Sequence, residues 1–170
     1  MDIGCFLCFA ILLYSNLRFY KTLKNNQKSI SKYQRGKLVV YQTNKVVTPC
    51  LFGVCKPSVY LPDNIVENLS ESDLQQVLDH EQMHYKHFDH IWSLLRCIIV
   101  SLYWFDPLVW VAAKISKQDA EFACDEGVLE KKNRSERIAY GEMLLHVAMH
   151  SKRVSMLCPV VTAVHNGKKK

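Results

Sequence analysis

The chain has 170 residues, which is enough for about one domain with a modest core. Apolar residues make up 49% and charged residues 22%, which excludes a disordered or fibrous protein. The mean hydropathy of −0.07 is too low for a chain made only of membrane spans. Seven cysteines at irregular spacings indicate no disulfide framework and favour a reduced, cytosol-facing compartment.

Residues 1–17 are apolar, and residues 18–36 are polar and basic. No acidic residue lies between Asp2 and Asp63, and the Lys and Arg residues of that stretch are concentrated just after the apolar run. This order is typical of a membrane anchor followed by a basic cytoplasmic linker. A nucleic-acid patch is the competing interpretation, but no recognition motif accompanies it, so direct nucleic-acid binding is not expected.

The apolar run is short for a membrane span. As a helix, residues 1–14 would cover about 21 Å, against roughly 30 Å of hydrocarbon. We therefore interpret residues 1–17 as a partial transmembrane segment and the chain as part of a larger membrane protein. Residues 156–170 are expected to be a truncated tail.

Residues 37–61 predict strands, because they are rich in β-branched and aromatic residues. The segments concerned are 37–43, 46–47 and 58–61. Gly53 and Pro57 interrupt the stretch and indicate a hairpin with a bent edge.

From about residue 70 to 150 the pattern is helical. Ser70 is a predicted N-cap, with Asp73 at the third helical position. Leu74, Val77 and Leu78 then form one apolar face at helical spacing. A helix that starts at Ser70 therefore has a defined buried side.

Residues 80–84 read His-Glu-Gln-Met-His, an H-E-x-x-H motif on this helix. Imidazoles at i and i+4 lie one turn apart, so both can bind one Zn²⁺ at about 2.0–2.1 Å. A rotation of 100° per residue places His80, Glu81 and His84 on or beside the buried face, where polar groups need partners. Glu81 can then accept a proton from water instead of binding the metal. The alternative is a pair of satisfied core histidines beside a surface glutamate.

A catalytic zinc site needs a third protein ligand, and Glu121 is the best candidate. Glu121 and Asp125 are at i and i+4, with Cys124 and Val128 on the same face. Asp125 can hold the free ring nitrogen of a ligand histidine. Taken alone, these acids also fit the ordinary solvated start of a helix.

Residues 91–113 are apolar enough to enter a membrane but are interrupted by Arg96, Asp106 and Pro107. A helical hairpin that turns there would bring Glu121 back to His84. Its legs are unequal, so we expect one of them to bend or be offset. Aromatic residues of this segment fit an interfacial belt, although a packed core would use the same residues. They are Trp92, Tyr103, Trp104 and Trp110.

Four segments, 48–62, 80–84, 103–110 and 121–129, resemble successive signatures of the BlaR/MecR-type peptidases, the membrane gluzincins of the beta-lactam sensor-transducer family. The resemblance covers roughly residues 37–150. We therefore predict an α+β, mostly helical fold: a gluzincin-type zinc metallopeptidase domain over 37–155, with a small β-hairpin or sheet and membrane-associated helices. The resemblance also implies that the peptidase domain faces the cytoplasm.

Carried over by position, the resemblance implies that His80, His84 and Glu121 are the zinc ligands and that Glu81 is the general base. Asp125 matches the acidic residue that closes the last signature. The hairpin edge would bind the substrate as an added strand. Its substrate-binding residues are predicted to be Leu51, Phe52, Gly53 and Val54.

The sequence thus predicts a membrane-associated, Zn²⁺-dependent endopeptidase that cleaves a protein substrate in a signalling pathway. The substrate is expected to be the protein itself or a transcriptional repressor. A homodimer is one possible oligomeric state. One rival is a catalytically silent or truncated fragment that serves in assembly. The other is a basic helical regulator that contacts acidic lipid or nucleic acid through residues 18–37.

Overall fold

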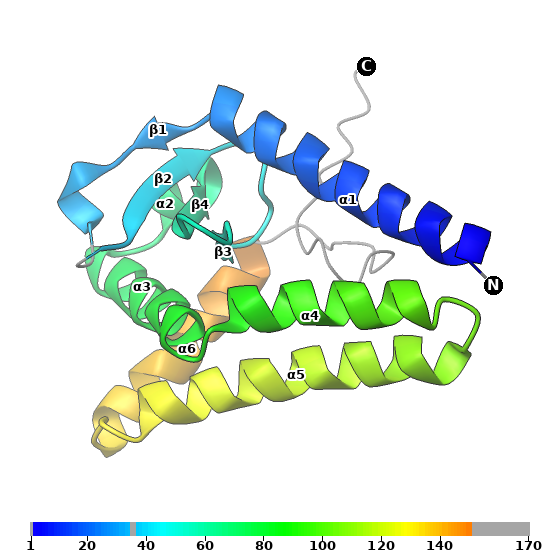
Figure 1. Ribbon diagram of the computed structural model, residues 1–170. Coiled ribbons are helices and arrows are strands. Elements are labelled where there is room, and N and C mark those ends of the chain that lie inside the picture. The colour runs from blue at the N-terminus through cyan, green and yellow to red at the C-terminus, as the bar shows by residue number, and fades with distance from the viewer. Residues whose placement is uncertain (1, 35–36, 151–170) are drawn as a thin grey trace.

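The computed structural model describes residues 2–34 and 37–150, so the expected tail at 156–170 lies outside the described residues. In chain order the elements are α1 (Asp2–Asn25), β1 (Lys28–Ser29), the 3-10 helix η1 (Ser31–Tyr33), β2 (Val39–Thr43), β3 (Cys50–Phe52), β4 (Ser58–Pro62), α2 (Asp63–Asn68), α3 (Glu71–Lys86), α4 (Asp89–Leu102), α5 (Pro107–Leu129) and α6 (Arg134–His150). A mostly helical chain with one small sheet confirms the predicted fold class (Figure 1).

The sheet has four strands in the order β1-β2-β4-β3. Strands β2 and β4 are parallel, whereas β3 pairs antiparallel with β4 and forms one edge of the sheet. The predicted hairpin is therefore present, and Gly53 at its turn has a φ of 112°, which an L side chain rarely adopts. The expectation of a strand at 46–47 is wrong, because these residues lie in the connection between β2 and β3. Val46 is nevertheless buried, against Phe19, Leu23 and Tyr60.

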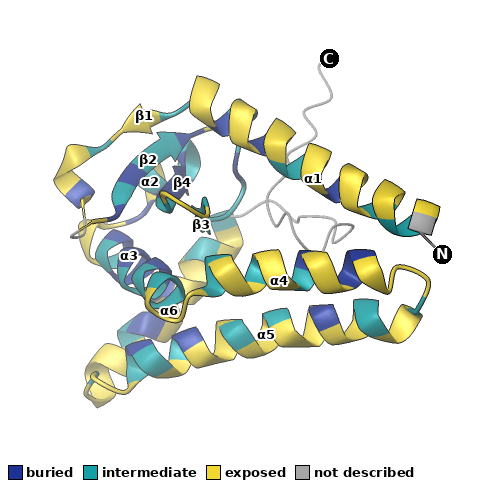
Figure 2. Cartoon of the chain, viewed as in Figure 1, coloured by how far each residue is buried: buried dark blue, intermediate teal, exposed yellow. Residues whose placement is uncertain are grey.

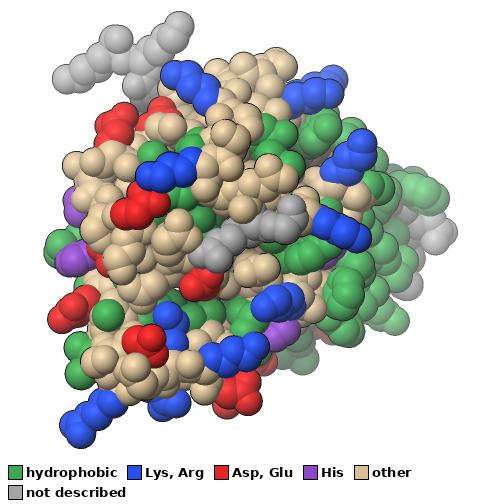
Figure 3. Space-filling view, turned by 90° about the vertical axis from the view of Figure 1, so that its left-hand side faces the viewer, with side chains coloured by type: hydrophobic (Ala, Val, Ile, Leu, Met, Phe, Trp, Pro, Cys, Tyr) green, Lys and Arg blue, Asp and Glu red, His purple; other side chains and the backbone are tan. Residues whose placement is uncertain are grey.

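Helices α2 and α3 pack against the sheet, and α6 packs against both of these helices; we call the sheet and these three helices the packed half (Figure 1). Its apolar core joins the strands to these helices and to the end of α5. The buried members are Tyr33, Leu38, Val40, Val59, Leu61, Ile65, Leu69, Leu74, Val77, Leu78, Val128, Tyr140 and Met143. The left-hand side of the molecule in Figure 1, which includes the packed half and the end of α5, carries Lys, Arg, Asp and Glu side chains (Figure 3). A buried core beneath a charged surface is the normal state of a water-facing domain.

The other part of the molecule is an apolar arm, which we define as residues 3–17 of α1 together with residues 91–115 of α4 and α5. Its helices run side by side, and most of their surface is exposed (Figures 1 and 2). A small cluster joins them: Leu12, Cys97, Val100 and Ala113. Large apolar side chains cover the outside of the arm, among them Ile3, Phe6, Leu7, Ile11, Tyr14, Trp92, Leu102, Leu108 and Val111.

Helices α4 and α5 form the expected hairpin, with its turn at residues 103–106. The two legs of the hairpin have similar lengths because the chain breaks between α3 and α4, where Phe88 adopts a left-handed φ of 59°. The outgoing helix α4 therefore starts only at Asp89 and has 14 residues. That length matches the return from Pro107 to Glu121, so the hairpin brings Glu121 back beside the end of α3.

Helix α1 extends beyond the apolar run of residues 1–17. It has 24 residues, which corresponds to about 36 Å, and it continues through Arg18 to Asn25 instead of ending before the basic residues. Residues Ile3–Asn25 are long and apolar enough to cross a membrane. The helix continues because Phe19 and Leu23 are buried against the sheet, which supports its last two turns.

Candidate active site

Helix α3 places the H-E-x-x-H motif at the boundary between the packed half and α5. The Ser70 side chain accepts a hydrogen bond from the Asp73 N–H at 3.1 Å, as expected for the predicted N-cap. Leu74 and Val77 are buried in the core, which fixes the rotation of the helix. One to two turns later the same face carries the side chains of His80 and His84 inward.

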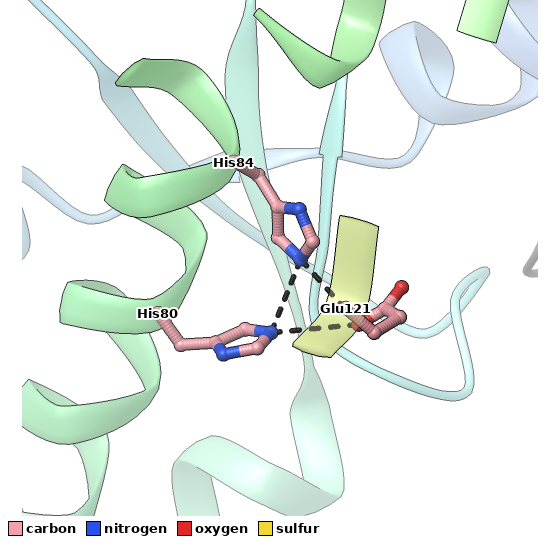
Figure 4. A group of neighbouring side chains, drawn as sticks. All are labelled: His80, His84 and Glu121. Atoms are coloured by element: carbon pink, nitrogen blue, oxygen red, sulfur yellow. Dashed lines mark hydrogen bonds and ion pairs between the residues drawn. The ribbon is translucent and has the colours of Figure 1, made fainter. Parts of the chain in front are cut away.

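Three side chains converge from two helices: His80 and His84 from α3, and Glu121 from α5 (Figure 4). The two Nε2 atoms are 3.1 Å apart. Glu121 Oε2 lies 3.6 Å from His80 Nε2 and 3.5 Å from His84 Nε2. A tetrahedral Zn²⁺ with ligands at about 2.0–2.1 Å separates them by about 3.3–3.4 Å, so this donor triangle has the size of a zinc site.

The far ring nitrogen of each histidine has a carboxylate beside it. Tyr140 donates from its hydroxyl to Asp125 Oδ1 at 2.7 Å and is 2.9 Å from His80 Nδ1, which itself lies 3.1 Å from Asp125 Oδ1. His84 Nδ1 lies 2.7 Å from Asp89 Oδ2. When each neutral histidine carries its ring proton on Nδ1, where the neighbouring carboxylate accepts it, both Nε2 lone pairs face one another. Two lone pairs at 3.1 Å repel unless a cation lies between them, so the donor set fits a metal ion.

Opposite charges also shape the pKa values of the triangle. Burial acts to raise the pKa of Glu121, but the contacts with His80 and His84 outweigh it and hold that pKa well below its usual range. Burial acts to lower the pKa of His84, but the Asp89 carboxylate, Cys124 and Glu121 outweigh it and raise that pKa. The carboxylate of Glu121 is therefore ionised and ready to bind a cation.

Glu81 adjoins the triangle without being part of it. Its side chain is only 5% exposed, and its Oε2 atom has no hydrogen-bond partner in the described chain. Burial raises the pKa of Glu81, although the two histidines and the backbone of Leu51 act against this. A buried carboxylate with a raised pKa and a free oxygen is suited to accept a proton.

Strand β3 runs along the edge of the site. A cavity of about 350 Å³ is lined by the triangle, by Glu81 and by Leu51 of this strand. A second, more apolar cavity of about 530 Å³ lies between α1, α4 and the hairpin, and it is lined by Leu51, Phe52, Gly53 and Val54. Of the four predicted substrate-binding residues, only Leu51 lines the cavity of the triangle.

The model of the family described as BlaR1 peptidase M56 matches residues 3–169. The chain belongs to the BlaR1 peptidase M56 family. It is 31% identical to the regulatory protein BlaR1 of Bacillus licheniformis over 158 residues, 85% of this chain and 26% of that protein. It is also 31% identical to the methicillin resistance mecR1 proteins of Staphylococcus aureus and Staphylococcus epidermidis over 123 residues, 72% of this chain and 21% of each.

The chain thus spans about a quarter of the length of these curated relatives. The M56 family consists of metallopeptidases, and the described residues of this chain hold a His/His/Glu group that can bind a metal ion. Membership confirms the predicted resemblance and supports the general class of hydrolase.

Sequence reasoning missed the contacts of three residues around this candidate site. Asp89 contacts His84, the buried thiol of Cys124 lies 3.1 Å from His84 Nδ1, and Tyr140 bridges His80 and Asp125. Asp89 lies only five positions after His84, so a search for carboxylates near the motif would have found it. Tyr140 comes from α6, and no local pattern indicates its contact.

Proposed function

We propose that this protein is a membrane-associated zinc endopeptidase that cleaves a protein substrate. The observation that supports this most directly is the donor triangle of His80, His84 and Glu121 beside a buried, unpartnered Glu81 oxygen. A peptidase needs a metal site, a base and a place for an extended peptide, and strand β3 offers the third.

The proposed metal is Zn²⁺, because two imidazoles and one carboxylate are the donor set of many catalytic zinc sites. When bound, the ion would polarise the scissile carbonyl and lower the pKa of water. His80 and His84 would hold it through Nε2, and Glu121 through its carboxylate. Asp125 and Tyr140 would keep His80 oriented, and Asp89 would do the same for His84.

Glu81 would act as the general base. Its free Oε2 would take a proton from the attacking water and then pass it to the departing amine. Burial favours the protonated form of this carboxyl, which makes the second transfer possible. Glu81 Oε2 has no hydrogen-bond partner in the described chain, so nothing there competes for this oxygen.

The substrate would be bound as an added strand on the exposed edge of β3. That edge has no further partner strand in the described sheet. Leu51 would place the peptide in the metal cavity, and residues 52–54 would extend its binding surface toward α1.

We further propose that α1 spans the cell membrane, with the basic residues 18–37 and the peptidase domain, residues 37–155, on the cytoplasmic side. The names of the relatives, a regulatory protein and methicillin resistance proteins, support a role in signalling. The substrate would be the protein itself or a transcriptional repressor.

The central test separates metal binding from chemistry. Glu81→Gln should keep its zinc and lose about 10²–10⁴-fold in the rate of cleavage, or about 3–5 kcal/mol of barrier. Glu121→Gln should lose both, because an amide is a poorer ligand than a carboxylate. Bound zinc and cleavage of a model protein are measured in the same preparations.

In that test the exposed Glu126→Gln, on the same helix as Glu121, is the matched control. Zinc loss in Glu81→Gln with retention in Glu121→Gln would reverse the assigned roles. If the wild type binds zinc but cleaves nothing, the peptidase proposal is wrong and the catalytically silent assembly module is favoured.

The membrane assignment has its own test. Expressing cells are fractionated, and their membranes are washed with high salt and then with carbonate. The chain should stay in the pellet until detergent is added, because α1 exposes apolar side chains along its length. Release by either wash would contradict the span.

A further inference from the structure

The cavity beside the donor triangle has a cationic end that the proposed chemistry does not use. Arg96 of α4 and Lys117 of α5 line it together with His80, Glu81 and Glu121. They are the lysine and arginine among its lining residues. Each enters from the side of the apolar arm, and both are partly buried.

Arg96 is held in place but is not neutralised. Its Nη1 donates to the hydroxyl of Ser116 at 3.1 Å and lies 3.4 Å from the carbonyl of the same residue. Its Nε atom is buried and has no hydrogen-bond partner in the described chain. No carboxylate of the described residues lies within ion-pair distance of the guanidinium. A buried, unpaired guanidinium donor is costly, which indicates that an acceptor binds there.

Lys117 lies on the same helix as Glu121, one turn earlier. Lys117 lines the same cavity as Cys50 and Leu51 of β3, the strand proposed to bind substrate. Within the described residues it forms no ion pair. Burial and the charge of Arg96 lower the pKa of Lys117, as expected for two cations that share one space.

With a divalent metal ion bound, the formal charges of the cavity add up to one positive charge. Its carboxylates are those of Glu81, Asp89 and Glu121, and its fixed cations are Arg96 and Lys117. A divalent ion in the donor triangle then leaves the cavity with an excess of one positive charge. A bound carboxylate would neutralise it.

We propose that Arg96 and Lys117 form a subsite that binds an acidic side chain of the substrate, within about two residues of the scissile bond. This inference rests on the proposed peptidase function. Lys117 and Glu121 are one helical turn apart, or about 6 Å along the axis, and an extended peptide advances about 3.3 Å per residue. Arg96 and Lys117 are therefore placed to bind a substrate side chain near the scissile bond, and not the reacting carbonyl itself.

The test compares two peptides that differ by one group. The full-length protein with zinc is first given a mixed peptide library, and the cleaved bonds are identified by mass spectrometry. We expect Asp or Glu to be enriched within two residues of the cleaved bond. A matched pair with Glu or Gln at that position then gives kcat/KM, and the wild type should prefer the Glu peptide about tenfold or more.

Variants assign the preference to the two cations. Lys117→Gln and Arg96→Gln should each bring the ratio of the two peptides close to one, whereas Lys114→Gln, an exposed lysine of the same helix, should keep it. Binding of both peptides to Glu81→Gln is measured in parallel by fluorescence anisotropy. The Glu peptide should bind about tenfold more tightly there as well.

The outcomes separate this subsite from the peptidase itself. Equal cleavage and equal binding of the two peptides would overturn the subsite and leave the peptidase standing. Preferred binding of the Glu peptide without cleavage by the wild type would overturn the peptidase and keep the subsite. A Lys117→Gln variant that slows both peptides equally would overturn the proposal in favour of a contact with the reacting carbonyl.

Discussion

The packed half and the apolar arm are built from similar apolar side chains, but they bury them to opposite extents. Ile65 in the packed half is fully buried, whereas Ile3 in the arm is 86% exposed. A large exposed apolar surface marks a binding or membrane surface in a folded protein. The comparison shows that apolar content alone does not define the core, because the arm is apolar on its outside.

The candidate metal site lies at the boundary between these two regions. The packed half supplies His80, Glu81 and His84 from α3, and the hairpin of the arm returns Glu121 from α5. Asp89, the first residue of α4, contacts His84 across the joint. The site therefore depends on both regions being correctly placed.

The largest effect should come from removing the same side chain in the two regions. Ile65→Ala should lower the free energy of unfolding by about 2–5 kcal/mol, because it leaves a cavity in the core. Ile3→Ala, the matched control, should change it by less than about 0.5 kcal/mol in detergent. Denaturant unfolding followed by fluorescence measures both. Equal losses of unfolding free energy in the two variants would mean that Ile3 is packed against protein. That result would contradict the contrast between a buried core and an exposed arm.

The next largest effect should come from the contact between Asp89 and His84, which joins the two regions. Asp89→Asn should weaken zinc binding by about 10–100-fold, because the amide holds the Nδ1 proton of His84 less firmly. The affinity is measured by competition with a chelator, and the exposed Asp119→Asn on α5 is the control. An unchanged affinity would show that His84 is oriented by other contacts.

A small effect should come from η1, which connects β1 to β2 and contacts the start of α3. Lys32 Nζ and the Tyr33 hydroxyl both lie near Glu71 Oε2, at 2.9 Å and 2.8 Å. These contacts lower the pKa of Glu71, so the stability they supply is present above its ordinary pKa and is lost as the pH falls through the lowered value.

Glu71→Gln should therefore lower Tm by about 1–2 °C at pH 7, as is usual for an exposed pair. The difference should shrink as the pH falls through the lowered pKa of Glu71, because the wild-type carboxyl becomes protonated there. Thermal scans at pH 7 and pH 3 check this. A difference that grows in acid would reverse the sign of the linkage.

Local patterns were sufficient for much of the packed half. The cap at Ser70 and the spacing of Leu74, Val77 and Leu78 fix both the start and the rotation of α3, so the inward direction of the motif follows from sequence. The hairpin at residues 103–106 was equally predictable, because Asp106 and Pro107 are strong signals for a new helix.

Tertiary contacts decided what sequence reasoning missed. Helix α1 extends beyond its apolar run because Phe19 and Leu23 are buried against the sheet. No local sequence pattern indicates this contact. The parallel pairing of β2 with β4 depends on a connection through the edge strand β3. Tyr140 reaches His80 from a helix 60 positions away, so its contact could not be read from local spacing.

The left-handed backbone at Phe88 has a mechanical consequence. Only His87 and Phe88 separate the end of α3 from the start of α4, so the two helices are joined without slack. A bulky residue in this conformation costs about 1–2 kcal/mol, and the turn persists because both flanking helices are held. Asp89 is the first residue of α4 and its Oδ2 lies 2.7 Å from His84 Nδ1, so a tilt of α4 would move the carboxylate that contacts this candidate metal ligand.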